Sequence, residues 1–175
     1  IELRINVEHG DAVINSINTM DGIDDAFNGN ETTPGTTLDQ ATSLVLTAVE
    51  DLTITEALST NLTNIDATAV ADAFTATLED MDGAFTLTTG AEATITLDGV
   101  TADAGTEIDG ALGDLTLVVA TTSDLSAATL TGVDAVNISE AQDVTLNADQ
   151  VVDIQEGNIN GVVSNTNTAE ILHIN

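Results

Sequence analysis

The sequence predicts a mainly β protein, an irregular parallel β-solenoid with one short helix. Apolar-polar-apolar triplets recur along the chain, and such alternation is typical of strands with one buried face. The apolar residues are chiefly Ala, Val, Leu and Ile, with three Phe and no Trp or Tyr, which favours a thin core between stacked strands. At 175 residues we expect a single domain. A β-sandwich is the alternative fold.

The clearest internal repeat joins residues 47–57 to residues 131–141, at an offset of 84. Val49, Leu52 and Ile54 lie over Val133, Val136 and Ile138, and the final Glu-Ala coincides. The segment Asp51-Leu-Thr-Ile54 recurs as Asp114-Leu-Thr-Leu117, at an offset of 63. Both offsets are multiples of 21, so the sequence predicts a coil of about 21 residues, within the range of solenoid repeats.

Three weaker echoes of the strand at Leu52 do not fit that period. Residues 84–88 follow it at an offset of 33, residues 152–154 at 100 and residues 172–174 at 120. Coils of unequal length would explain these offsets, and so would a β-sandwich whose strands merely look alike.

The elements expected first along the chain are a strand over residues 3–7 and a loop or insertion over 20–37, which holds the single proline. A weak helical pattern runs over 39–49. Repeat-like strands fill residues 44–175, and the last of them covers 169–174. Both end strands look cut in mid-course, so we expect a processed form or a segment of a longer chain. Their unpaired edges would suit pairing with a neighbouring copy.

One short amphipathic helix is predicted over residues 66–81. Val70, Phe74, Leu78 and Met81 follow one another at spacings of four, four and three, which place them on one helical face. Asp66 is a suitable N-cap for this helix.

The charge of the chain excludes several functions. Thirty acidic residues stand against one basic residue, Arg4, which gives a net charge of −29. A chain of this kind does not neutralise phosphates, so neither nucleic acid nor an anionic membrane surface is an expected partner. No apolar run approaches the ~20 residues of a membrane span, so we expect no membrane insertion. The absence of Lys and Cys excludes Schiff-base, thiol and zinc-thiolate chemistry.

Calcium is the cofactor that the charge suggests, because carboxylates bind this cation and it would relieve their mutual repulsion. Two acidic segments each offer several oxygen ligands. The candidate metal ligands are Asp21, Asp24, Asp25, Asn28 and Glu31 in the first segment, and Glu79, Asp80 and Asp82 in the second. Neither segment has the spacing of an EF-hand loop, and a solvated acidic loop is the alternative interpretation of each.

We do not expect an enzyme. Paired carboxylates could serve a carbohydrate-active β-helix enzyme, but the chain has no Trp or Tyr to stack on sugars. His9 and His173 lie near opposite ends, in strand-like segments. Alternating threonines at 53/55, 86/88 and 94/96 are attributed to β-propensity on a solvent face rather than to an ice-binding ladder. The apparent counterparts at 137 and 139 are Asn and Ser, which would interrupt such a ladder.

A resemblance to a known class lies in residues 130–150, Leu-Thr-Gly-Val-Asp-Ala-Val-Asn-Ile-Ser-Glu-Ala-Gln-Asp-Val-Thr-Leu-Asn-Ala-Asp-Gln. This stretch resembles the repetitive β-rich regions of bacterial S-layer proteins and of RTX-associated adhesins exported by type I secretion. The acidic, threonine-rich, cysteine-free composition is also similar, and the resemblance covers residues 44–175. The calcium-binding nonapeptide GGxGxDxUx of β-rolls is absent from the chain.

The resemblance implies an extracellular or cell-surface structural protein that assembles with itself into a layer or filament, stabilised by calcium. Its partner would be further copies of the same chain, joined through strands 3–7 and 169–174 and the loop 20–37. The alternative is a spacer or ligand-binding module of a large secreted adhesin, for which a cell-surface glycan is a candidate partner.

Overall fold

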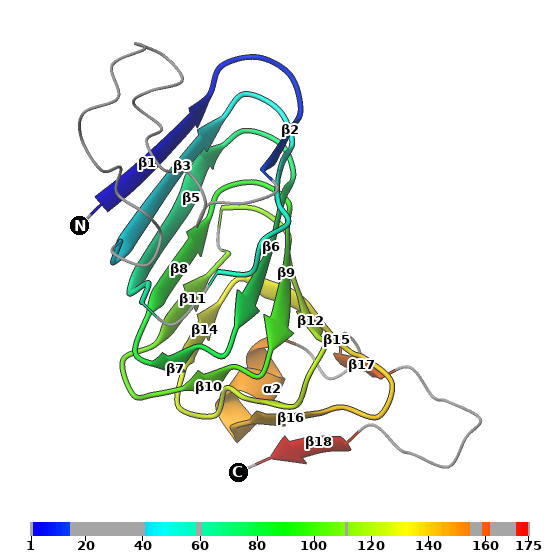
Figure 1. Ribbon diagram of the computed structural model, residues 1–175. Coiled ribbons are helices and arrows are strands. Elements are labelled where there is room, and N and C mark those ends of the chain that lie inside the picture. The colour runs from blue at the N-terminus through cyan, green and yellow to red at the C-terminus, as the bar shows by residue number, and fades with distance from the viewer. Residues whose placement is uncertain are drawn as a thin grey trace.

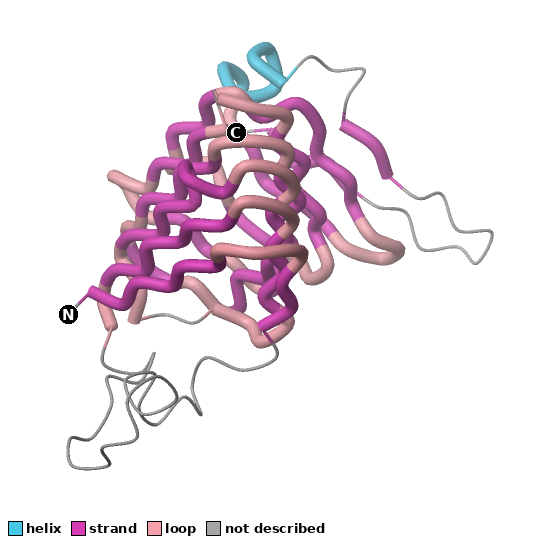
Figure 2. The backbone as a smooth tube through the Cα atoms, turned by 90° about the horizontal axis from the view of Figure 1, so that it is seen from above, coloured by secondary structure: helices cyan, strands magenta, loops and turns pink. Residues whose placement is uncertain are grey.

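The computed structural model describes residues 2–14, 41–58, 61–110, 112–154, 159–161 and 171–174. These residues form a mostly parallel β-solenoid, in which each coil from β5 to β16 contributes a strand to each of three sheets (Figures 1 and 2). The predicted fold class is therefore confirmed, and the sandwich alternative is wrong. We call the three sheets the first, second and third face, in the order in which the chain visits them.

All strand pairs within each face are parallel. The first face consists of β1 (Glu2–Val7), β3 (Ser43–Ala48), β5 (Asn64–Val70), β8 (Thr86–Thr89), β11 (Glu107–Asp109) and β14 (Thr129–Thr131). The second face consists of β2 (Ala12–Ile14), β4 (Leu52–Ile54), β6 (Phe74–Glu79), β9 (Ala93–Asp98), β12 (Leu115–Val119), β15 (Val133–Ile138) and β17 (Ile159–Gly161). The third face consists of β7 (Asp82–Gly83), β10 (Thr101–Ala102), β13 (Ser123–Asp124), β16 (Asp143–Leu146) and β18 (Ile171–Ile174).

The core is built from apolar residues that stack in columns from coil to coil. One such column lies on the inner side of the second face, where strand pairing brings each member onto the next. Its members, each at most 3% exposed, are Leu58, Leu78, Leu97, Val119 and Ile138. Because side chains alternate in and out along a strand, each triplet supplies two residues to such columns.

Strand register explains the repeats found in the sequence. Leu52 pairs with Phe74, Phe74 with Ala93, and Ala93 with Leu115, so the offset of 63 spans three coils. Thr53 continues through the same strands to Ala135, an offset of 82. The alignment at 84 was therefore displaced by two residues. A displacement of two leaves inward positions inward, which is why the apolar pattern still matched.

The offsets that did not fit the period compare unlike parts of the fold. Residues 52–54 belong to the second face, residues 86–89 to the first and residues 171–174 to the third. Residues 152–154 end a helix. Sequence offsets between strands on different faces therefore do not measure the number of residues in a coil.

The helix predicted over 66–81 is wrong, because this segment forms β5, a corner and β6. The spacing of four between Phe74 and Leu78 fits a strand as well as a helix, since both residues then lie on one side of the sheet. Asp66 lies within β5, where its Oδ1 accepts hydrogen bonds from the N–H (3.0 Å) and hydroxyl (2.6 Å) of Thr68. The weak helical pattern over 39–49 is also wrong over its described part, which holds β3.

The one short helix of the described chain is α2 (Ala148–Ile154), in a segment for which a strand was predicted. Asn147 caps it: the Asn147 Oδ1 accepts the Gln150 N–H (3.0 Å), and the Gln150 Oε1 accepts the Asn147 N–H (2.7 Å). This reciprocal pair is a capping box. The sequence signal was Asn147-Ala-Asp-Gln150, a capping residue followed three positions later by Gln.

The expected end strands are present as β1 and β18. The loop expected over 20–37 lies outside the described residues.

Replacing Thr89 by valine is expected to stabilise the fold. Thr89 is 1% exposed, and its hydroxyl lacks a hydrogen-bond partner in the described structure. A buried unsatisfied hydroxyl costs roughly 1–3 kcal/mol, so an isosteric methyl should raise the free energy of unfolding by about 1 kcal/mol. Urea denaturation of Thr89→Val measures this, with Thr88→Val on the outer side of β8 as the control. A loss of stability in Thr89→Val larger than that in the control would contradict the assignment.

Candidate functional site

The corner between the first and second faces carries the most regular set of carboxylates. The residue before each strand of the second face occupies one position of this corner, and its backbone bonds to the next coil. Leu52 N–H donates to the Ala73 carbonyl (2.8 Å), Phe74 N–H to that of Glu92 (2.9 Å) and Ala93 N–H to that of Asp114 (2.8 Å). Four of the five corner residues from β2 to β12 are acidic, namely Asp11, Asp51, Glu92 and Asp114, and Ala73 is the exception.

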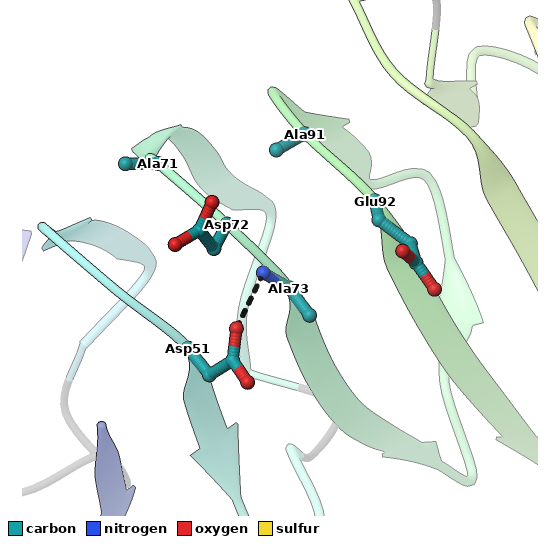
Figure 3. Close-up of a pocket in the computed structure, with 6 residues that line it drawn as sticks. All are labelled: Asp51, Ala71, Asp72, Ala73, Ala91 and Glu92. Atoms are coloured by element: carbon teal, nitrogen blue, oxygen red, sulfur yellow. Dashed lines mark hydrogen bonds between the residues drawn. The ribbon is translucent and has the colours of Figure 1, made fainter.

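An open concavity of about 510 Å³ lies on this acidic corner (Figure 3). It is lined by Asp51, Ala71, Asp72, Ala73, Ala91 and Glu92. The Asp51 Oδ1 accepts a hydrogen bond from the Ala73 N–H at 3.0 Å, so this carboxylate ties one coil to the next (Figure 3). All three carboxylates of the concavity are exposed to solvent.

Close backbone packing fixes the shape of the corner. A Cβ atom on Gly90 would lie 2.3 Å from the Thr68 carbonyl oxygen, and one on Gly113 would lie 2.3 Å from that of Ala91. Neither distance is possible for a real Cβ, so glycine is required where successive coils approach this closely. Glu92 and Asp114 therefore follow turns whose backbones pack closely against the preceding coil.

The second predicted metal segment lies at the corner between the second and third faces. Glu79 ends β6, Asp80 has a left-handed φ of 48°, and Asp82 lies in β7. All three are exposed. Glu79 pairs with Asp98 of the next coil, and the Asp80 N–H donates to the Asp98 carbonyl (2.8 Å). Asp98 itself accepts a hydrogen bond from the Thr121 hydroxyl.

The fold thus brings Glu79 and Asp80 close to Asp98, which the sequence analysis did not select, while Asp82 pairs with Thr101 on the third face. Among the described residues, no group of three or more His, Asp or Glu side chains is arranged to hold a metal ion. The other predicted ligands, Asp21, Asp24, Asp25, Asn28 and Glu31, lie outside the described residues.

Sequence reasoning also missed the corner residues Asp51, Glu92 and Asp114 as one row. The available signal was an acidic residue directly before an inward apolar one, as in Asp51-Leu52 and Asp114-Leu115. A row of exposed carboxylates attracts hydrated cations through its summed field without a coordination shell.

The two histidines do not form a site within the described structure. His9 is exposed in the turn after β1, and His173 belongs to β18 at the other end of the chain. Within the described ranges, no helix has the length and apolar character that a membrane span requires.

Comparison with known proteins finds no matching family model, no significantly similar curated protein and no significantly similar solved structure.

Proposed function

We propose that this chain is a structural, extracellular protein that assembles with itself into a surface layer or filament, with calcium between the carboxylates of neighbouring copies. The observation that supports this proposal best is the pair of strand edges at the two ends of the solenoid. The S-layer-like and adhesin-like sequence of residues 44–175 supports the same function.

The first end of the described solenoid presents β1 and β2, and the second end presents β17 and β18. Within the described residues each of these four strands pairs on one side only. An unpaired edge is a template for a further strand. Pairing of β17 or β18 of one copy with β1 or β2 of the next would continue a β-ladder from copy to copy, and such head-to-tail contacts produce open filaments.

The two ends differ, which favours head-to-tail contact over contact between like ends. Helix α2 packs on β14 and β15, so it covers the last strand of the first face. The opposite end of that face is the β1 edge. A filament built this way would be polar.

Charge makes this assembly dependent on cations. The chain carries a net charge of −29, and the described residues contain a single ion pair, between Arg4 and Glu2 (2.5 Å). Both partners are exposed, so this pair contributes little. Copies therefore repel one another at low ionic strength, and a divalent cation that binds carboxylates reduces the repulsion more effectively than monovalent salt.

Assembly is expected to appear on addition of calcium and to reverse with a chelator. Light scattering and electron microscopy of the chain would follow it, with sodium chloride at matched ionic strength as the control for simple screening. A chain that stays monomeric at every calcium concentration, or that assembles equally in sodium chloride, would contradict the role proposed for calcium.

Proline at Asn6 is expected to prevent assembly without unfolding the chain. The Val49 N–H donates to the Val7 carbonyl, so Val7 bonds toward β3; since successive residues alternate, the Asn6 N–H faces the open edge. Proline is tolerated at such positions and removes the N–H that a new strand would use. Ala104→Pro is the control. Ala104 is exposed at the second position of a turn closed by the Thr106 N–H and the Asp103 carbonyl (3.0 Å), where proline is favoured. Equal assembly of Asn6→Pro and Ala104→Pro would exclude the β1 edge as a contact between copies.

A spacer module of a large adhesin is the second candidate. The described chain starts on the first coil and ends at β18 on the last, so its ends lie at opposite ends of the solenoid (Figure 1). A module of this shape would hold apart two segments that were joined to its ends. Sedimentation in calcium distinguishes the candidates, because a spacer stays monomeric while a layer or filament protein polymerises.

A further inference from the structure

The outer side of the second face carries threonines in register across four coils. Thr53 pairs with Thr75, Thr75 with Thr94, and Thr94 with Thr116. A second column lies two residues further along the strands, where Thr77 pairs with Thr96. We call these six residues the threonine face: Thr53, Thr75, Thr77, Thr94, Thr96 and Thr116.

The register changes the interpretation made from sequence. Thr53 and its partners continue to Ala135, and Thr96 continues through Val118 to Asn137. Asn137 and Ser139 are therefore not the counterparts of Thr53 and Thr55, as the displaced alignment suggested. The threonine column is uninterrupted from β4 to β12, and its members are half-buried or exposed.

The threonine face is uncharged in a chain of net charge −29. In the two columns, the positions that flank the threonines are also uncharged: Val13, Val118, Ala135 and Asn137. The corresponding outer positions of the first face, by contrast, include Asp66, Glu107 and Asp109. The carboxylates near the second face, such as Glu79 and Asp98, lie at the ends of its strands.

The spacing of the two columns is set by the β-structure itself. Adjacent strands lie about 4.8 Å apart, and residues two positions apart along a strand are separated by about 6.7 Å. These two distances are close to the two repeats of the prism plane of hexagonal ice. Each threonine offers a hydroxyl that donates one hydrogen bond and accepts others, next to a methyl group that does not compete for them.

Other kinds of ligand fit this face less well. The threonines occupy four strands in the first column and two in the second, so they cover at most roughly 20 Å by 10 Å. This is well below the ~800 Å² per partner of a standard protein interface. The face offers no charge for an ionic ligand, and the concavity described above lies on the corner instead. The threonines repeat along the strands and across them, so a ligand with a regular lattice of similar spacing is the one that matches this face best.

We propose that the threonine face binds ice, with ordered water as its ligand. Water held by the hydroxyl columns at the ice spacing would merge with the lattice of a growing crystal. This activity is separate from the proposed assembly, which uses the ends of the solenoid, and each can fail without the other.

The test is ice affinity and thermal hysteresis of the isolated chain, without calcium so that it stays unassembled. The wild type is expected to be enriched in slowly grown ice and to show thermal hysteresis. Thr94→Tyr places a bulky ring at the centre of the face and is expected to lose most of both, as is Thr75→Tyr. The matched control is Thr88→Tyr on the outer side of the first face, between Asp66 and Asp109, which should behave as the wild type.

Exclusion of the wild type from ice would overturn the proposal. Equal effects of Thr94→Tyr and Thr88→Tyr would also overturn it, since the face would then not be the site. Circular dichroism confirms that each variant is folded before it is scored. If Thr94→Tyr changes the sedimentation of the chain while ice affinity is absent, the face is a contact between copies and the proposal is wrong.

Discussion

Replacing Leu97 by alanine is expected to lower the free energy of unfolding by about 2–5 kcal/mol. Leu97 lies on β9, is fully buried, and pairs with Leu78 on one side and Val119 on the other. Truncation leaves a cavity between two coils that the strand ladders prevent from collapsing. The loss is measured by guanidinium denaturation.

The neighbouring outward residue provides the control for Leu97→Ala. Thr96 is on the same strand with its side chain on the outer side, so Thr96→Ala removes β-propensity without creating a cavity, at a cost of at most ~1 kcal/mol. Similar losses in the two variants would show that the inner column does not carry the stability of the solenoid.

Replacing Gln150 by alanine is expected to cost about 3 kcal/mol. This side chain is 4% exposed, and its Nε2 donates to the carbonyls of Leu125 (2.8 Å) and Ala128 (2.7 Å). Its Oε1 also accepts the Asn147 N–H. Truncation removes these three hydrogen bonds, each contributing roughly 0.5–1.5 kcal/mol net, while the Leu125 carbonyl still accepts the Ala128 N–H (2.9 Å). Thermal and urea unfolding would measure the loss.

Two further variants separate the roles of Gln150. Gln150→Glu keeps the acceptor that completes the capping box but places a carboxylate against two carbonyl oxygens, so it should be at least as destabilising as alanine. Asp149→Ala, an exposed change in the same helical turn, should cost only about 0.3–1 kcal/mol. A Gln150→Ala effect no larger than that of Asp149→Ala would mean that α2 does not depend on this contact.

The fold class was predictable because the alternation of apolar and polar residues along a strand is unchanged when two repeats are misaligned by two residues. The triplet at Leu52 and the one at Leu115 are true equivalents, and even the displaced repeat kept inward residues inward. Coil lengths were not predictable in detail. From β4 to β15, successive strands of the second face are displaced by 22, 19, 22 and 19 residues, because the corners between strands differ in length without changing the apolar alternation.

Helix placement failed for an identifiable reason. The spacing of Val70, Phe74 and Leu78 satisfies both helical and strand periods once a corner falls between the first two, and the corner at Asp72 carries neither glycine nor proline. The capping box at Asn147 was a better helix signal than any apolar spacing.

The candidate site was only partly predictable. Glu79 and Asp80 were identified as acidic neighbours in sequence, but Asp98 comes beside them only through pairing of β6 with β9. Likewise, Asp51 and Glu92 share one concavity across two coils. Contacts of this kind depend on the register between strands of neighbouring coils. The apolar pattern alone does not determine that register.

The stacking of coils in columns has a consequence for how the molecule opens. Each coil contacts chiefly the coils before and after it, so an end coil is held on one side and a middle coil on both. Amide hydrogen exchange should therefore be graded along the axis, slowest at β9 and β12 and faster toward β1. Local opening begins at the end coils and proceeds inward. The middle coils therefore stay folded while the strands of the end coils open and close.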